Sequence, residues 1–215
     1  MIHIHFFKTI FLLLFLSTIG ISQMKGNKTM QQGAATPEEL LQYSAKAIQE
    51  KRFDDFQTLY FAQSEKEKKE VFATIELLKL WERIEIWIKN GNEKFGGDFY
   101  NAIDAIKFEL NLAAVPNYSS AKKIKLSKIQ DDEFASTTLA YKDLLTNSED
   151  YQGYGMEKHA GRWYHPLPTK RVVLAKAMEQ CVTQLEKLLL QEKNAQDIVK
   201  KVKPLRDLFN EYYEL

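Results

Sequence analysis

The spacing of apolar residues changes near residue 121, and this change constrains the fold more than any other feature. Before it, apolar side chains recur every three or four residues, which predicts helices. After it, segments such as KKIKLSKI and EFASTTLAYKDL alternate or are rich in β-branched and aromatic residues, which predicts strands. Helices followed by consecutive strands indicate an α+β fold with an antiparallel sheet.

Helix-end signals divide the first half of the chain. Thr36, Pro37 and Glu39 predict a capped helix over residues 36–51, and RFDDFQTLYF follows as a short second helix. Ser64 begins a long helix, which we expect to end at a C-cap formed by Asn90-Gly91. FYNAIDAIKFEL predicts a further helix, ending before Pro116.

About four strands are predicted, and the last two form a hairpin. They are 122–129, 133–144, 151–158 and 161–165, with Asp131-Asp132 as a turn. Ala160-Gly161 is the expected centre of the last turn, because glycine accepts the positive φ that a tight turn needs. This register places Lys158 opposite Trp163.

Residues 169–215 predict a C-terminal helical hairpin, packed on or appended to an α+β domain of residues 36–168. Pro166 and Pro168 end the sheet, because proline cannot donate to a ladder. Thr169 is the expected cap of a helix to about residue 193, and Asn194 that of a last helix, which Pro204 should kink or split.

Residues 1–22 have the pattern of a secretory signal peptide. Lys8 precedes an apolar run over residues 10–16, and the small residues Gly20 and Ser22 indicate cleavage after Ser22. An uncleaved anchor is the alternative, although the run is shorter than the roughly 20 residues that span a bilayer. Residues 23–35 are polar with two glycines and predict a flexible leader. We therefore expect a periplasmic or secreted protein.

Charge and cysteine content exclude several classes of partner and site. Without residues 1–22 the chain has 29 basic and 29 acidic residues, which argues against nucleic acid and against anionic membranes as partners. Cys181 is the only cysteine, so no intramolecular disulfide and no cysteine-based zinc site is expected. We expect neither a cofactor nor a metal.

GMEKHAGRWYHPLP contains two histidines, His159 and His165, and a Trp-Tyr pair. The hairpin register separates the two imidazoles by roughly 10 Å, too far to share a metal ion. Strand alternation puts Trp163 and His165 on one face. The aromatic residues of the strands, Tyr154 among them, indicate either a ligand pocket or cross-strand packing.

TPEELLQYSAKAIQEKRFDDFQTLY and HAGRWYH resemble the opening helices and the closing strand of the nuclear-transport-factor-2-like family, over about residues 36–166. The resemblance implies a cone-shaped α+β fold in which helices pack on a curved antiparallel sheet. That family includes isomerase-type and cyclase-type enzymes and many non-catalytic binding or assembly modules. Membership therefore does not decide the function.

Three functions remain open. The first is a non-enzymatic exported binding or accessory module for a small hydrophobic molecule or a protein partner, with a pocket on the concave sheet face near Tyr154, Trp163 and His165. The second is an isomerase or dehydratase that uses His165 with a carboxylate such as Asp98 or Asp104. The third is an interaction protein acting through the C-terminal helices.

Overall fold

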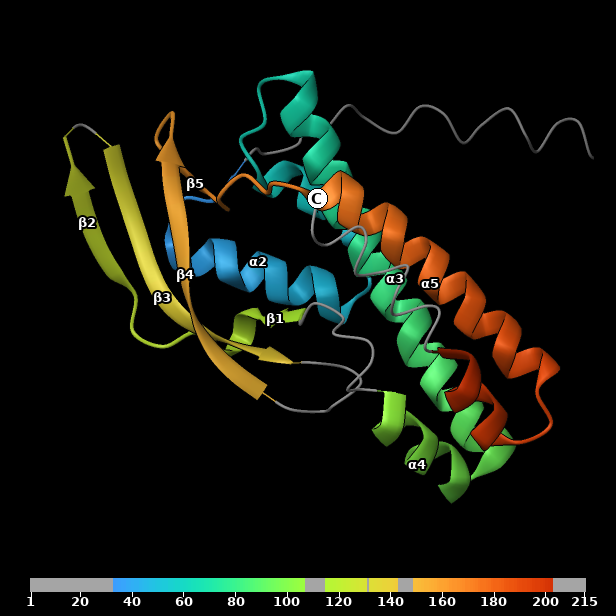
Figure 1. The fold of residues 1–215 in the computed structure, drawn as a ribbon. Coiled ribbons are helices and arrows are strands. Elements are labelled where there is room, and N and C mark those ends of the chain that lie inside the picture. Colours follow the sequence, from blue (N-terminus) through green and yellow to red (C-terminus); the bar gives the residue numbers. More distant parts are fainter. Residues whose placement is uncertain (1–32, 107–114, 131, 143–148, 203–215) are drawn as a thin grey trace, which may run out of the picture. The chain divides into compact units, whose positions relative to one another are not determined.

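A computed structural model describes residues 33–106, 115–130, 132–142 and 149–202 of the chain. Its helices are α2 (Pro37–Gln49), the 3-10 helix η1 (Phe53–Leu59), α3 (Glu65–Phe95), α4 (Gly97–Ile106), the 3-10 helix η2 (Tyr118–Ser120) and α5 (Arg171–Gln191). Most helices precede the sheet, which confirms the α+β class (Figure 1). The predicted signal peptide lies outside the described residues.

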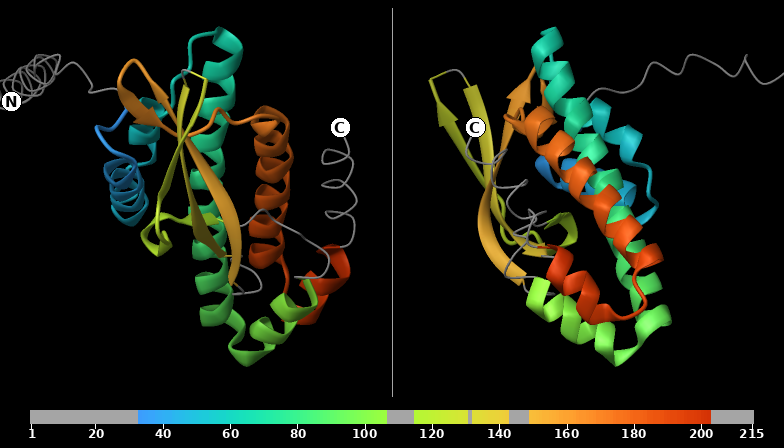
Figure 2. Two further views of the ribbon diagram at one scale, coloured as in Figure 1. Left: turned by 90° about the vertical axis from the view of Figure 1, so that its left-hand side faces the viewer. Right: turned by 45° about the vertical axis from the view of Figure 1, so that its right-hand side comes forward.

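The sheet is antiparallel and strongly curled (Figures 1 and 2). Its strands are β1 (Val115–Asn117), β2 (Lys125–Ile129), β3 (Asp132–Lys142), β4 (Glu149–His159) and β5 (Arg162–Tyr164). The order is β1-β3-β4-β5, and β2 pairs with the same edge of β3 as β1 does. The strand not predicted is β1, a three-residue edge strand that contains Pro116.

The β4–β5 hairpin has the predicted register. Lys158 pairs with Trp163, and both turn residues, Ala160 and Gly161, have a positive φ, as a two-residue type I′ turn requires. On its other edge, Trp163 exchanges two backbone hydrogen bonds with Ala34, at 2.8 and 2.9 Å. Gly33 N–H also donates to the carbonyl of Thr58. These bonds order the chain from Gly33 onward, inside the segment expected to be a flexible leader.

α2 lies across the concave side of the sheet (Figure 1). The Thr36 hydroxyl accepts a hydrogen bond from Glu39 N–H, which confirms the predicted N-cap. The Glu39 carboxylate accepts from Ala35 N–H, one residue before the cap position. The helix buries Leu40 and Leu41 in the core, so its apolar face is the one turned toward the concave surface.

α3 runs past its predicted end. Ser64 and Glu67 form the capping box at its start, but the helix continues through Gly91 to Phe95 and ends at Gly96, where φ is 59°. The predicted C-cap at Asn90-Gly91 is therefore wrong. A Cβ on Gly91 would lie 2.0 Å from the ring of Phe99 in α4, so this glycine instead gives space for helix packing.

α5 packs lengthwise against α3 (Figures 1 and 2). The Trp87 indole donates to the carbonyl of Leu185 at 2.9 Å, and Arg83 forms ion pairs with Glu179 and Glu186 at 2.8 and 2.7 Å. The buried residues of α5 are Ala177, Met178, Cys181, Val182, Leu185 and Leu189. The apolar stripe of α5 is thus part of the core.

The ends of the C-terminal helices agree only partly with their signals. Lys170, in a left-handed conformation, precedes α5, so the predicted cap at Thr169 is wrong. Residues 195–202 are helical, and the Asn194 side chain accepts from Asp197 N–H at 3.0 Å, which confirms that cap. Pro204 lies outside the described residues. Within the described ranges, no helix has both the length and the hydropathy needed to cross a bilayer.

Candidate functional site

His165 is buried at the end of β5 and is hydrogen-bonded through both ring nitrogens. Its Nε2 lies 2.6 Å from the Ser44 hydroxyl of α2, and its Nδ1 lies 2.7 Å from the Tyr154 hydroxyl of β4. Ser44 donates its only hydroxyl proton to the carbonyl of Leu40 at 2.8 Å. Ser44 must therefore accept from Nε2–H, which leaves Nδ1 to accept from Tyr154.

The environment of His165 keeps the imidazole neutral. Burial lowers its pKa to about 3, and its other neighbours are the rings of Phe56, Tyr60 and Tyr118, at 5.3–6.1 Å between centroids. The structure does not bring it to the acidic partner expected for catalysis, because Asp98 is exposed on α4. The side chain of Asp104 lies outside the described part of the chain. His165 is thus held as a fixed hydrogen-bonding group.

Three tyrosines contact His165, namely Tyr60, Tyr118 and Tyr154, and Tyr141 acts electrostatically on the pKa of all three. Burial raises the pKa of each of them, so all remain protonated donors at neutral pH. Tyr118 packs edge-on against Tyr154, with 5.8 Å between ring centroids. The positive charge of Arg171 partly opposes the rise in the pKa of Tyr60, Tyr118 and Tyr141.

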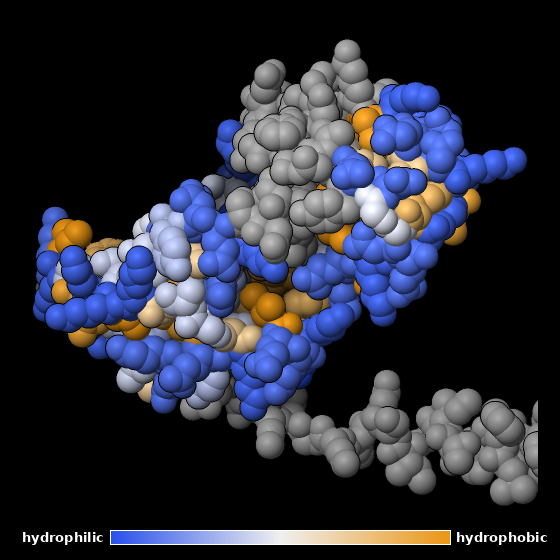
Figure 3. Space-filling model, turned by 90° about the horizontal axis from the view of Figure 1, so that it is seen from below, coloured by the Kyte–Doolittle hydropathy of each residue, from blue (hydrophilic) through white to orange (hydrophobic). Residues whose placement is uncertain are grey.

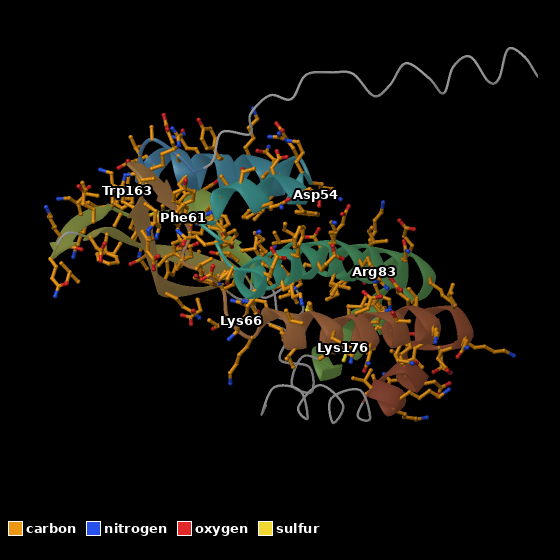
Figure 4. All side chains as sticks on the ribbon, turned by 90° about the horizontal axis from the view of Figure 1, so that it is seen from above. Asp54, Phe61, Lys66, Arg83, Trp163 and Lys176 are labelled. Carbon is orange, nitrogen blue, oxygen red and sulfur yellow. The ribbon has the colours of Figure 1, made fainter. Side chains whose placement is uncertain are left out.

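The three residues predicted to line a pocket have different surroundings. Tyr154 and His165 are joined by their hydrogen bond, whereas Trp163 is buried with the Lys158 ammonium group 5.7 Å from its ring (Figure 4). α2 and η1 cover the concave face at His165, through Ser44 and Phe56. None of the three lines either of the two cavities described below.

Sequence reasoning missed the partners that reach His165 from outside the sheet. Ser44 and Tyr118 come from α2 and η2, and Tyr60 follows η1. One signal was present: Ser44 is a polar residue on the apolar face of its helix, at positions that otherwise bury leucine and alanine. Such a serine needs a buried partner in the fold.

An apolar cleft lies between the end of α2, the middle of α3 and β1. Its volume is about 220 Å³. Its apolar lining consists of Ile48, Phe53, Leu78, Trp81, Val115 and Pro116, and its polar lining of Lys51, Glu82, Glu85, Asn117 and Lys142. Seen from below, apolar side chains show through a hollow between the sheet and the helices (Figure 3). Lys51 and Glu82 form an ion pair of 2.6 Å at its edge.

A second cavity, of about 450 Å³, lies beside the first half of α2 and η2. It is lined by Glu38, Leu41, Gln42, Ala45, Tyr118, Ser119, Ala121, Lys122 and Ile124. Its wall is more polar than that of the first cleft and lacks tryptophan and phenylalanine. It therefore offers less apolar surface to a small ligand.

His159 lies apart from His165. Its ring stacks on Phe61 with 4.7 Å between centroids, and its Nε2 lies 3.1 Å from the Glu157 carboxylate. In the described part of the chain, no three side chains of the metal-ligating kinds converge on one point.

Comparisons of the chain with protein-family models, with curated proteins and with solved structures found no match.

Proposed function

We propose that the chain is a non-enzymatic binding module that holds a small apolar molecule in the cleft between α2, α3 and β1. The observation that carries this proposal is the composition of the cleft wall, in which six apolar side chains converge from separate elements. Phe53 and Trp81 are largely buried by their own packing and so form stiff walls. Apolar walls with a few polar groups at the edge are typical of small-molecule sites.

The size and edge of the cleft define the class of ligand. A volume of about 220 Å³ accommodates a molecule of one or two rings or a short acyl chain. The charged side chains at the edge include Glu85 and Lys142, besides the Lys51–Glu82 ion pair. These groups would orient a polar end of the ligand while its apolar body replaces water inside.

The same geometry supports binding over catalysis. General acid–base chemistry needs a group near the substrate whose pKa lies close to the working pH. His165 does not line the cleft, its pKa is lowered to about 3, and both of its nitrogens are engaged. α5 buries its apolar stripe against α3, which also favours a binding module over an interaction protein acting through that stripe.

We also propose that residues 36–166 adopt a nuclear-transport-factor-2-like cone and that the protein is exported. The order of elements supports the first proposal, because helices precede a curled antiparallel sheet that ends in the β4–β5 hairpin. The apolar run after Lys8 supports the second. Within that family fold, binding and assembly modules are as well accommodated as enzymes.

The binding proposal is tested by filling the cleft. Calorimetric titration with 2-naphthol should give one binding site in the wild type, and affinity weaker by about tenfold or more in Val115→Trp, whose indole would occupy the space. Leu126→Trp is the matched control, because Leu126 is 69% exposed on β2, away from the cleft. Equal affinity in Val115→Trp and the wild type would show that the cleft is not the site.

A further inference from the structure

β2 forms an open edge of the sheet. It pairs with β3 on one side, and no described segment forms a backbone hydrogen bond with its other side. Figures 1 and 2 show β2 at the border of the sheet that lies away from α3 and α5. In an antiparallel edge strand, alternate residues direct their N–H and C=O groups outward. β2 therefore offers a row of backbone donors and acceptors to a further strand.

Two large apolar side chains of this edge are exposed. Leu126 is 69% exposed and Ile129 is 64% exposed. Leu126 pairs with Ala135, which in turn pairs with Met156, and both of these partners are buried. An apolar row therefore crosses β4 and β3 inside the core and ends at Leu126 in solvent. A strand beside β2 would place a side chain next to Leu126 on the same face and shield it from water.

The same edge is strongly positive. Residues 122–130 contain no acidic residue and four lysines, Lys122, Lys123, Lys125 and Lys128. Lys122 lies over the ring of Tyr151, with its ammonium group 4.1 Å from the centroid. Lys128 is opposite Glu133, but the Glu133 carboxylate accepts a hydrogen bond from Lys158 at 2.7 Å. Lys123 and Lys125 form no ion pair within the described part of the chain. The positive charge of this edge is thus largely unbalanced.

The lysines determine which kind of strand fits. Lysines on an edge strand discourage pairing with the same edge of another copy. Two β2 strands side by side would bring the four lysines of each copy together, and like charges across a strand pair are destabilising. An acidic strand has the opposite effect, because its carboxylates would face the lysines. The edge therefore disfavours self-association and favours an acidic partner.

We propose that β2 is the docking edge for an extended acidic segment of a partner protein, which adds to the sheet as a further antiparallel strand. In this mode of recognition the backbone hydrogen bonds supply affinity, and alternate side chains supply specificity. The segment carries acidic residues opposite Lys125 and Lys128 and apolar residues opposite Leu126 and Ile129. β2 contributes no residue to the apolar cleft, so this interaction stands independently of the function proposed above.

The test is a fluorescence anisotropy titration of the full chain into the fluorescein-labelled peptide TVETVETVET at low ionic strength. Antiparallel to β2, this peptide places glutamates opposite Lys125 and Lys128 and valines opposite Leu126 and Ile129. It should bind with a Kd below about 1 mM. The peptide TVKTVKTVKT should bind about tenfold more weakly or worse, because its charge is reversed. So should TVETVETVET methylated at every backbone nitrogen, which keeps the side chains but cannot donate to β2.

Charge reversal on the protein tests the lysines. The double variant Lys125→Glu/Lys128→Glu should weaken binding of TVETVETVET by about tenfold or more. The matched control is Lys176→Glu/Lys187→Glu, which changes the net charge equally at two exposed lysines of α5 (Figure 4 labels Lys176). It should bind the peptide nearly as the wild type does, because its charges lie on another element.

A second pair of variants tests the apolar contact. Leu126→Ser should weaken binding by about threefold or more, because the leucine loses its contact with a valine of the peptide. Leu190→Ser is the matched control, since Leu190 is 81% exposed on α5, and it should bind as the wild type does. Both leucines are exposed, so both variants should fold, and their melting temperatures check this.

Four outcomes would overturn the proposal. The wild type does not bind TVETVETVET with a Kd below about 1 mM, or it binds the methylated peptide equally well. The α5 double variant loses as much affinity as the β2 double variant, which would indicate long-range attraction alone. Finally, sedimentation shows a dimer that becomes a monomer in Leu126→Ser, in which case a second copy of the chain occupies the edge.

Discussion

Substitution of His165 by Gln should make the stability of the fold less sensitive to mild acid. Burial lowers the pKa of His165 to about 3 in the folded state, whereas an unfolded histidine has a pKa of about 6.5. Below about pH 6.5 the unfolded chain binds a proton that the folded chain excludes. The contribution of the neutral imidazole to stability is therefore complete above about pH 6.5 and declines as the pH falls toward 3.

The magnitude follows from the two pKa values. One pKa unit corresponds to about 1.4 kcal/mol, so lowering the pH from 7 to 5 should reduce the free energy of unfolding by about 2 kcal/mol through His165 alone. Burial of the ring is nearly complete, at 1% exposure, so solvent screening does not diminish this value much. His165→Gln lacks the titrating group and should lose about 2 kcal/mol less over the same interval.

Urea unfolding followed by circular dichroism at pH 7 and pH 5 measures this difference. The comparison is between the two pH values within each variant, so a general loss of stability in His165→Gln does not affect it. His159→Gln is the control for the loss of a histidine outside this network, because His159 is partly exposed. An unchanged pH dependence in His165→Gln would refute the reasoning, as would an imidazole NMR titration of His165 with a midpoint near 6.5.

Two further predictions concern packing. Gly91→Ala should lower the free energy of unfolding by about 1–3 kcal/mol, because the new methyl group meets the Phe99 ring. Gly97→Ala is the control. It should change the free energy of unfolding by about 0.5 kcal/mol or less, because no atom lies within 4 Å of the added Cβ. Similar melting temperatures for both variants would contradict this packing role. Cys181 is fully buried and its pKa is raised to about 11, so 5,5′-dithiobis(2-nitrobenzoate) should label it only after unfolding in urea; rapid labelling of the native chain would contradict its position in the core.

The elements that the sequence predicts best are those that local chemistry determines. The β4–β5 turn needs two residues with positive φ, and Ala160-Gly161 between alternating segments satisfies that need without help from distant parts of the chain. The N-caps at Thr36, Ser64 and Asn194 are local in the same way, because each serves a backbone N–H three residues later.

The errors occur where a distant partner decides the structure. The Asn90-Gly91 pair is typical of a helix C-cap, and only the position of Phe99 shows that Gly91 instead makes room for the Phe99 ring. Pro116 reads as the stop signal of a helix, but its pairing with Tyr141 places it in an edge strand. Local pattern cannot separate these alternatives, because the same residue type serves both.

The candidate sites show the same division. Strand alternation puts Trp163 and His165 on one face, yet it cannot supply Ser44 or Tyr118, which approach from helices. The apolar cleft likewise joins α2, α3 and β1, three elements whose packing no short segment specifies.

The pairing of β5 with two distant segments has a consequence for how the chain folds during synthesis. Ala34 pairs with Trp163 about 130 residues later, and Tyr60 pairs with His165 about 105 residues later. Contacts of such high sequence separation form slowly, because a long loop must close first. During synthesis α2 also leaves the ribosome well before β5 and His165, which complete the core around Ser44. Nascent chains shorter than about 165 residues should be aggregation-prone intermediates, the kind of species that chaperones protect.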